Sequence, residues 1–422
     1  MTHNKKTLAQ WITKIESFHP NEIELGLERI TQVAHKLNLI NQTAKIIIVG
    51  GTNGKGSCVA TLESLALGAD LKIGCYTSPH LLKFNERIRI NGKDVSDQIL
   101  QQAFEIIDRA REKLALTFFE FTTLVALLVF KQAFLELVVL EVGLGGRLDA
   151  VNMVEPDATI ITTIDFDHQF WLGNRLQDIA FEKSGICRKG IDNFVGDPQS
   201  FDLILNARPE YCRELTLIEI NDSKGDRYKP LFDLVSDDSI NPHRLLLQNL
   251  MLAIRAFEAI FPDEFFRLDL AEVISHIQIK GRFQKISNRP LMILDVGHNV
   301  QAAKNLVTQI KKLEKNQVGK KIAICGLMAD KAIGDYLSIM DEVIDEWYFV
   351  DLPLERAETA KNLLKNYRNI TNEKQVYTAQ SVFNAQRQME SKISKDDRVF
   401  IFGSFITVAE MLKCKKINAN KT

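Results

Sequence analysis

The segment 45–57 constrains the fold of this chain more than any other. A run of apolar, mostly β-branched residues, 46–49, stops at a glycine cluster, GGTNGKGS, and a helical pattern begins directly after it. This order of strand, glycine-rich loop and helix is typical of parallel sheets that bind phosphates. Backbone N–H groups of such a loop turn towards one anion, and the helix N-terminus and Lys55 add positive charge. The segment therefore predicts a phosphate cradle at a sheet edge.

The spacing within this loop differs from the common nucleotide-binding pattern G-x-x-x-x-G-K-[ST]. Val49 stands at the position of the first glycine, and Gly56 separates Lys55 from the hydroxyl of Ser57. From these residues alone, a glycine-rich turn without a ligand stays open as an alternative. A strand, a lysine and a serine in this order favour a nucleotide triphosphate, with the Ser57 hydroxyl on its Mg²⁺.

The length of the chain and the alternation of its patterns predict two α/β domains. At 422 residues the chain exceeds what one hydrophobic core usually supports. A polar link at 281–290 marks the boundary, so we expect domains 1–289 and 290–422. The first would be a doubly wound P-loop domain and the second a smaller Rossmann-like domain. Residues 200–240 are mixed and polar, and we expect hairpins and loops there.

Charge and cysteine usage exclude several classes of protein. The 53 basic and 54 acidic residues nearly cancel, which argues against nucleic acid or a membrane surface as a partner. A local basic patch stays open as an alternative. The six cysteines lie far apart without a C-x-x-C pair, so neither a zinc site nor a disulfide framework is indicated. The N-terminal segment lacks the apolar core of a signal peptide, and no apolar stretch approaches the roughly 20 residues of a membrane span. We expect a cytoplasmic protein.

Polar residues lie at or just after the carboxyl ends of three further expected strands of the first domain. Ser78 comes after strand 72–76, Glu141 lies in the apolar strand 137–142, and His168 follows strand 158–164. Parallel strands bring their carboxyl ends to one edge, beside the phosphate loop. A carboxylate in an apolar strand is costly unless it is paired or binds a metal, which favours a functional role for Glu141. The alternatives are a turn residue for Ser78, a solvent-reaching acid for Glu141 and a structural His168.

In the second domain, expected strands and helices again alternate along the sequence. We expect strands at 291–296, 321–325, 346–350 and 398–402, three of which end in polar clusters. These clusters contain Asp295 and His298, the segment 326–331, and Ser404. Polar residues at the strand ends of a doubly wound domain suggest half of a ligand site. Plain helix caps remain the alternative.

Taken together, these segments resemble the folylpolyglutamate synthase and dihydrofolate synthase family of ATP-dependent amide ligases, which are related to the muramyl ligases. The resemblance runs from LGLER at 25–29 to GSF at 403–405. It rests on seven further motifs, which are GTNGKGS (51–57), SPH (78–80), LEVGLGGRLDA (140–150), DH (167–168), EKSG (182–185), GRF (281–283) and D-x-x-H-N (295–299).

The resemblance implies that ATP phosphorylates a pterin carboxylate and that the amine of L-glutamate then displaces the phosphate. It implies catalytic roles for Lys55, for His298 and for Lys183, a residue whose own context suggests only a solvated helix lysine. Lys183 matches the position at which the lysine side chain is carbamylated in the family. One or two Mg²⁺ ions would be held by Ser57, Glu141, His168 and Lys183. Contacts with ATP would come from Asn53, Gly54, Lys55, Gly56, Ser78, Asn249, Arg282 and Asp295.

The resemblance also implies the positions that contact the other substrates. His298 and Ser404 are the candidates for glutamate. Dihydropteroate and folates would contact Glu24, Leu25, Gly26, Leu27, Thr117, Phe118, Phe119, Glu120, Arg147, Leu148 and Asp149. We expect both activities and a monomer. The alternatives are a folylpolyglutamate synthase alone, a muramyl ligase, or a nucleotide-binding protein without catalysis.

Overall fold

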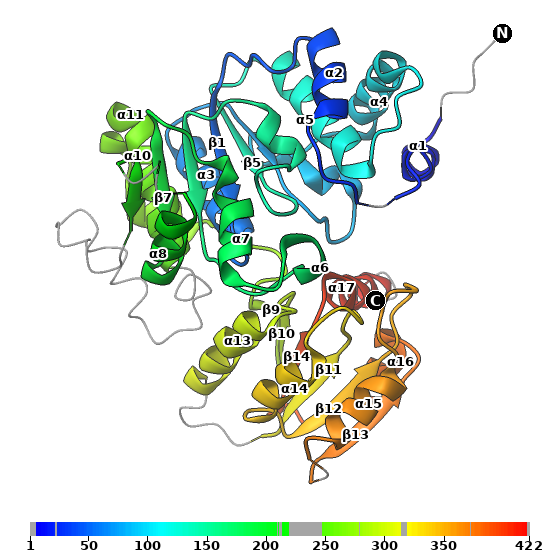
Figure 1. Ribbon diagram of the computed structural model, residues 1–422. Coiled ribbons are helices and arrows are strands. Elements are labelled where there is room, and N and C mark those ends of the chain that lie inside the picture. The colour runs from blue at the N-terminus through cyan, green and yellow to red at the C-terminus, as the bar shows by residue number, and fades with distance from the viewer. Residues whose placement is uncertain are drawn as a thin grey trace. The chain divides into compact units, whose positions relative to one another are not determined.

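The computed structural model describes residues 6–21, 23–208, 210, 213–218, 247–277, 279–313, 319–371 and 373–419. These residues form two compact units, the first ending at 277 and the second beginning at 279. Each unit is one sheet with helices on both faces (Figure 1). The α/β class and the doubly wound arrangement predicted from the sequence are therefore confirmed.

The sheet of the first unit has eight strands in the order β4-β3-β2-β5-β1-β6-β7-β8. The two strands at one edge are antiparallel, and they are β3 (Ile88–Ile90) and β4 (Lys93–Asp94). The others are parallel, and they are β1 (Lys45–Gly50), β2 (Ile73–Tyr76), β5 (Leu137–Glu141), β6 (Ala158–Ile161), β7 (Asp192–Val195) and β8 (Leu215–Leu217).

The central strand β1 is buried on both faces of this sheet. Ile46 and Ile48 join one core cluster, to which one layer of helices contributes. Ile47 and Val49 alternate with them and face the other layer. The first layer contains α1 (Leu8–Glu16), α2 (Glu28–Lys36), α4 (Asp97–Arg111), α5 (Phe118–Gln132), α7 (Leu176–Lys183) and α8 (Pro198–Ala207). The second contains α3 (Lys55–Gly68) and α10 (Leu247–Ile260), which pack against each other, and α12 (Leu270–Ser275).

The sheet of the second unit has six strands in the order β13-β12-β11-β14-β10-β9. Five are parallel, namely β10 (Leu291–Asp295), β11 (Lys321–Cys325), β12 (Glu346–Val350), β13 (Gln375–Ala379) and β14 (Arg398–Phe402). One core cluster joins the sheet to α13 (Val300–Lys312), α14 (Ile333–Asp341) and α15 (Ala360–Arg368). The opposite face carries α16 (Val382–Glu390) and α17 (Phe405–Ala419), which contact each other (Figure 1).

Two expectations about irregular segments differ from the structure. The stretch 281–290 is not a free link, because β9 (Gln284–Asn288) pairs antiparallel with β10. The compact units therefore part before residue 279, whereas the sequence places the boundary after 289. The polar stretch 200–240 contains most of α8, which continues to Ala207. Asp197 stabilises the start of this helix by accepting a hydrogen bond from the Ser200 N–H (2.9 Å). Residues 219–240 lie outside the described residues.

Candidate functional site

The glycine-rich loop that follows β1 folds around the side chain of Lys55. Gly51 and Gly54 have positive φ angles of +132° and +97°, which favour glycine. A Cβ on Gly51 would lie 1.9 Å from Thr162 Oγ1, so only glycine allows the loop to pass here. The Lys55 amine donates hydrogen bonds to the carbonyls of Gly51 (2.9 Å) and Thr52 (3.3 Å). The loop thus holds a cation at the N-terminus of α3, which is the arrangement of an anion site.

Asn249, on α10, lies directly against the loop. A Cβ built on Gly54 would be 2.5 Å from Asn249 Oδ1. The Cys58 thiol donates a hydrogen bond to the Asn249 carbonyl at 3.3 Å, which ties α10 to α3. Two ATP positions implied by the resemblance, Gly54 and Asn249, are therefore neighbours in space although they are far apart in the sequence.

The end of β5 and the segments that follow β2, β1 and β6 meet at the carboxyl edge of the sheet. The Ser78 N–H donates to Glu141 Oε2 (3.1 Å), and Glu141 pairs in register with Val49, just before the loop. On the other side, the Thr52 N–H donates to the Thr163 carbonyl (2.7 Å). The structure thus brings Ser78 and Glu141 together and ties the loop to the segment that leads to His168.

The predicted metal ligands offer oxygen and nitrogen atoms at this edge. Ser57 lies buried in the first turn of α3, Glu141 is 6% exposed at the end of β5, and His168 is exposed at the start of α6 (Gln169–Leu172). Among the described residues, no group of three or more His, Cys, Asp or Glu side chains is placed to hold a metal ion. The predicted set contains only two such residues. A Mg²⁺ ion that keeps waters and phosphate oxygens needs only one or two carboxylates, so the donor set fits such an ion.

Lys183, the last residue of α7, is buried, which differs from the solvated position that its local sequence suggests. Burial and the charge of Lys55 lower the pKa of Lys183 to about 7. Near neutral pH a large fraction of this amine is therefore unprotonated. The unprotonated amine is the form that reacts with CO₂, so this environment suits the carbamate that the resemblance implies.

The loop 143–149 packs beside Lys183. The backbone N–H of Arg147 donates to the Glu182 carbonyl at 2.7 Å, and its guanidinium forms an ion pair with the Glu182 carboxylate, also at 2.7 Å. Asp149 is buried within the loop and accepts hydrogen bonds from the N–H groups of Leu144 (2.8 Å) and Val151 (3.0 Å). Burial nevertheless raises the pKa of Asp149 to about 6.

The three segments implied for dihydropteroate are joined to one another. The Gly26 N–H donates to the Leu148 carbonyl at 3.4 Å. Arg29, on α2, forms ion pairs with Glu24 and with the buried Glu120 of α5, the latter at 3.3 Å. Sequence analysis missed Arg29, because an arginine in an amphipathic helix looks ordinary and its partner Glu120 is 91 positions away.

The predicted residues of the second unit gather at the ends of β10 and β14. Asp295 accepts hydrogen bonds from the N–H groups of Phe283 (2.9 Å) and Gly297 (2.7 Å). The ring of Phe405 lies 6.4 Å from that of His298 and 5.9 Å from the Arg282 guanidinium. The Ser404 hydroxyl, which is buried, accepts a hydrogen bond from the Thr407 N–H at 3.1 Å and therefore caps α17.

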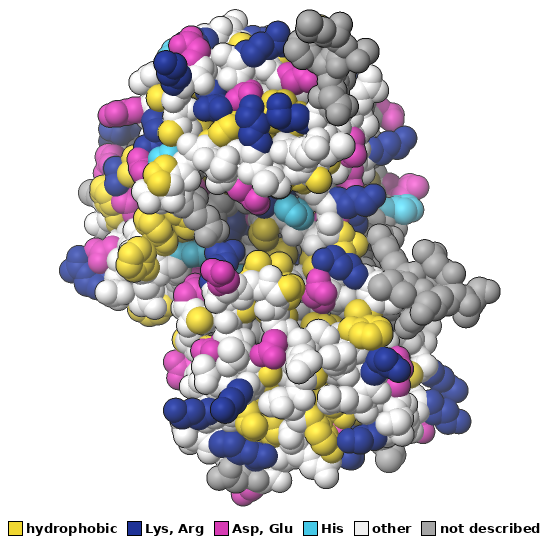
Figure 2. All heavy atoms as spheres, turned by 90° about the vertical axis from the view of Figure 1, so that its right-hand side faces the viewer, with side chains coloured by type: hydrophobic (Ala, Val, Ile, Leu, Met, Phe, Trp, Pro, Cys, Tyr) yellow, Lys and Arg dark blue, Asp and Glu magenta, His cyan; other side chains and the backbone are white. Residues whose placement is uncertain are grey.

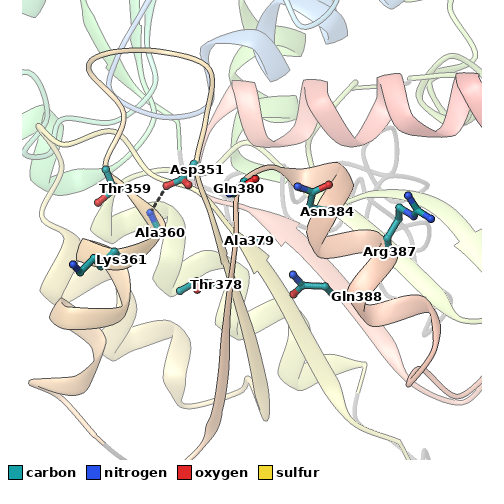
Figure 3. Close-up of a pocket in the computed structure, with 10 residues that line it drawn as sticks. All are labelled: Asp351, Thr359, Ala360, Lys361, Thr378, Ala379, Gln380, Asn384, Arg387 and Gln388. Carbon is teal, nitrogen blue, oxygen red and sulfur yellow. Dashed lines mark hydrogen bonds between the residues drawn. The ribbon is translucent and has the colours of Figure 1, made fainter.

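A separate cavity of about 800 Å³ opens in the second unit at the carboxyl ends of β12 and β13 (Figure 3). None of the predicted site residues lines it. Its walls come from the first turn of α15, from the first two turns of α16 and from the ends of the two strands. They consist of Asp351, Thr359, Ala360, Lys361, Thr378, Ala379, Gln380, Asn384, Arg387 and Gln388. The Asp351 carboxylate is directed at the α15 N-terminus, where it accepts a hydrogen bond from the Ala360 N–H at 2.7 Å.

The surface shows no gathering of one sign of charge on the face drawn in Figure 2, where basic and acidic side chains are both spread over the molecule. This distribution agrees with the nearly balanced composition. Within the described ranges, no helix combines the length and the apolar character that a membrane crossing needs.

The fold and the site define a ligase of the Mur type, and a family model described as Mur ligase, glutamate ligase domain, matches residues 281–405. The chain is 35% identical to the dihydrofolate synthase/folylpolyglutamate synthase of Haemophilus influenzae, over 96% of both chains. It is 36% identical to the Escherichia coli protein of the same name, over 96% of this chain and 95% of that one. The chain therefore belongs to the dihydrofolate synthase/folylpolyglutamate synthase family.

Solved structures agree with this assignment. A structure of E. coli FolC in complex with DHPP and ADP matches with a TM-score of 0.85 and 32% identity over 99% of both chains. A bifunctional folylpolyglutamate synthase/dihydrofolate synthase with Mn, AMPPNP and L-glutamate bound matches with a TM-score of 0.83 and 35% identity, over 97% of this chain and 98% of that chain. The family and the fold inferred from the sequence are thus confirmed.

We predict that Gly54→Ala weakens ATP binding by about tenfold or more. The added methyl group would displace Asn249 and strain a backbone with φ of +97°. Gly334→Ala is the matched control, because a Cβ there meets nothing within 4 Å. Titration calorimetry with ATP would measure both variants, and unchanged affinity of Gly54→Ala would contradict the assignment of this contact.

We also predict a pH-dependent stability effect of Asp149→Asn. The folded-state pKa of Asp149 is raised from 3.8 to about 6, so ionisation favours the unfolded chain as the pH rises from about 4 to about 6. Asparagine cannot ionise. The stability of the variant relative to the parent should therefore improve over this range, by up to about 3 kcal/mol. Unfolding by denaturant at several pH values measures this difference, and a constant difference would show that burial does not perturb this carboxyl.

Proposed function

We propose that this protein is an ATP-dependent ligase that joins L-glutamate to dihydropteroate and to the γ-carboxylate of folates. The observation that carries the proposal is a phosphate loop built around Lys55, with Glu141 beside it, in a chain 35% identical to a relative named for both activities over 96% of its length. We further propose that it works in the cytoplasm, where ATP is available.

In the proposed reaction, a carboxylate oxygen of the pterin substrate attacks the γ-phosphorus of ATP, and ADP leaves. The amino group of L-glutamate then attacks the acyl phosphate, an amide bond forms, and phosphate departs. These steps depend mainly on positioning and on neutralising charge. The loop N–H groups and Lys55 would bind the phosphates, and Asn249 would contact the nucleotide beside Gly54.

Ser57, Glu141 and His168 would hold Mg²⁺ at the carboxyl edge, with Lys183 as a further ligand once it is carbamylated. A bound Mg²⁺ ion screens the negative charges of the phosphates and the substrate carboxylate. Glu141 accepts a hydrogen bond from the Ser78 N–H, which orients its carboxylate at this edge. In the second unit, His298 and Ser404 are the proposed contacts for glutamate, and Arg282 and Asp295 are proposed to contact ATP.

The alternative functions have weaker support. A folylpolyglutamate synthase alone would fit the site, but the Haemophilus and E. coli relatives at 35% and 36% identity are named for both activities. A muramyl ligase has weaker support because the relatives at 35% and 36% identity are named dihydrofolate synthase/folylpolyglutamate synthase, and they match over 96% of this chain. A protein without catalysis is disfavoured because Lys55, Ser57, Glu141, His168 and Lys183 are all present.

We expect purified protein with ATP, Mg²⁺ and L-glutamate to release ADP when either dihydropteroate or tetrahydrofolate is added. Mass spectrometry should show one added glutamate on dihydropteroate and an extended chain on the folate. Omission of glutamate is the control. Absence of glutamate-dependent ADP with both pterins would refute the ligase proposal, and activity with the folate alone would refute only the bifunctional one.

We expect Glu141→Ala and His168→Ala each to lower kcat by more than about 100-fold, because each removes a proposed ligand of the ion that screens the phosphates. Glu112→Ala and His276→Ala serve as controls, since both residues are exposed and outside the site. Activity measured over a range of Mg²⁺ concentrations should show weaker apparent binding of the ion. Near-normal rates in both site variants would overturn the metal assignment.

A further inference from the structure

Arg87 is a buried cation that sequence analysis did not single out. It ends the short 3-10 helix Phe84–Arg87, just before β3, and its exposure is only 9%. The Arg87 carbonyl accepts a hydrogen bond from the Thr77 N–H at 2.9 Å, next to Ser78. Its backbone is therefore fixed beside the carboxyl edge of the sheet, in the same unit as the phosphate loop.

The guanidinium of Arg87 has only neutral partners in direct contact among the described residues. Its Nε donates a hydrogen bond to His80 Nδ1 at 2.8 Å. Its plane lies over the rings of Phe118, at 5.3 Å, and Phe84, at 5.9 Å. Burial and the charge of Arg87 lower the pKa of His80 to about 4, so this imidazole is uncharged at neutral pH.

The acidic side chains near Arg87 are engaged elsewhere. The Glu86 carboxylate accepts hydrogen bonds from three backbone N–H groups of the preceding loop, at 2.9 to 3.1 Å. Glu141 interacts with the charge of Arg87 but accepts its hydrogen bond from the Ser78 N–H. Within the described part of the chain, Arg87 forms neither an ion pair nor a hydrogen bond through its two Nη groups.

The half-buried arginines of this unit, by contrast, form ion pairs with carboxylates. Arg89, two residues further along, forms an ion pair with Glu63 at 2.9 Å. Arg111 also lies over an aromatic ring, that of Phe18, but it pairs with Asp108 at 2.7 Å. A buried cation without an anion is costly. The contrast singles out Arg87 as a group that gains from a negatively charged ligand.

We propose that the Nη groups of Arg87 bind a carboxylate of the pterin substrate. This inference rests on the proposed function. The two Nη groups form a planar fork that matches a carboxylate. Phe118, against which the guanidinium lies, belongs to a segment implied for dihydropteroate, and Glu141 is a proposed metal ligand. Arg87 thus lies next to both the ring-binding segment and the phosphoryl-transfer site, where the carboxylate end of the substrate must be held.

The test compares two ligands and measures binding without ATP. One ligand is dihydropteroate, and the other is the same molecule with hydrogen in place of its carboxylate. We expect the parent protein to prefer dihydropteroate by about 10- to 100-fold, as for hydrogen bonds to a charged group. Arg87→Met should abolish this preference and leave ATP binding unchanged, and Arg87→Lys should retain part of it. Arg111→Met, which also removes an arginine from an aromatic ring, should keep the full preference.

The outcomes separate the inference from the proposed function. Equal loss of affinity for both ligands in Arg87→Met would mean that Arg87 only shapes the site, and it would overturn the inference. A full preference in Arg87→Met would overturn it as well. If Arg87→Met does not fold, the Arg87→Lys measurement decides, because an unchanged preference in that variant would contradict recognition by the fork. Failure of the parent protein to bind either ligand would instead refute the proposed function.

Discussion

The pairing of β1 between β5 and β6 is the constraint on which the rest of the first unit depends. Five consecutive residues of β1, 46–50, are buried, so the strand cannot shift without exposing apolar side chains or breaking both ladders. This pairing fixes the point at which the loop leaves the sheet. It also places Glu141 opposite Val49 and the segment after β6 beside Gly51. The positions of the candidate site residues therefore follow from the burial of one strand.

The sequence predicts this fold well where strands are buried on both faces. Continuous apolar runs mark β1, β5, β11, β12 and β14, and each lies in the interior of its sheet. Edge strands are different. The outermost strands of the second sheet, β9 and β13, contain polar residues on their exposed faces and lack such a run. Only their pairing with β10 and β12 makes them strands, and their own polar sequences carry no apolar pattern that would indicate this pairing.

The site likewise contains residues that a local sequence pattern predicts and residues whose position depends on packing between separate elements. Ser78, Glu141 and His168 could be grouped from the sequence because parallel strands bring their carboxyl ends to one edge. The burial of Lys183 could not be foreseen, since it arises from the loop 143–149 packing on α7. The sequence alone does not single out Arg29 or Arg87, because the contacts that distinguish them are with residues of another element. These contacts are with Glu120 for Arg29 and with Phe118 for Arg87.

The cations of the first unit fall into two groups by what surrounds them. Arg89 and Arg147 face carboxylates, and their charges are already neutralised in the protein. Arg87 differs, because its guanidinium has aromatic rings and a neutral imidazole against it. Such a buried cation raises the free energy of the folded protein as long as no anion is present. A triphosphate or a substrate carboxylate removes part of this cost when it binds, so the same charges that weaken the fold strengthen the binding of anions.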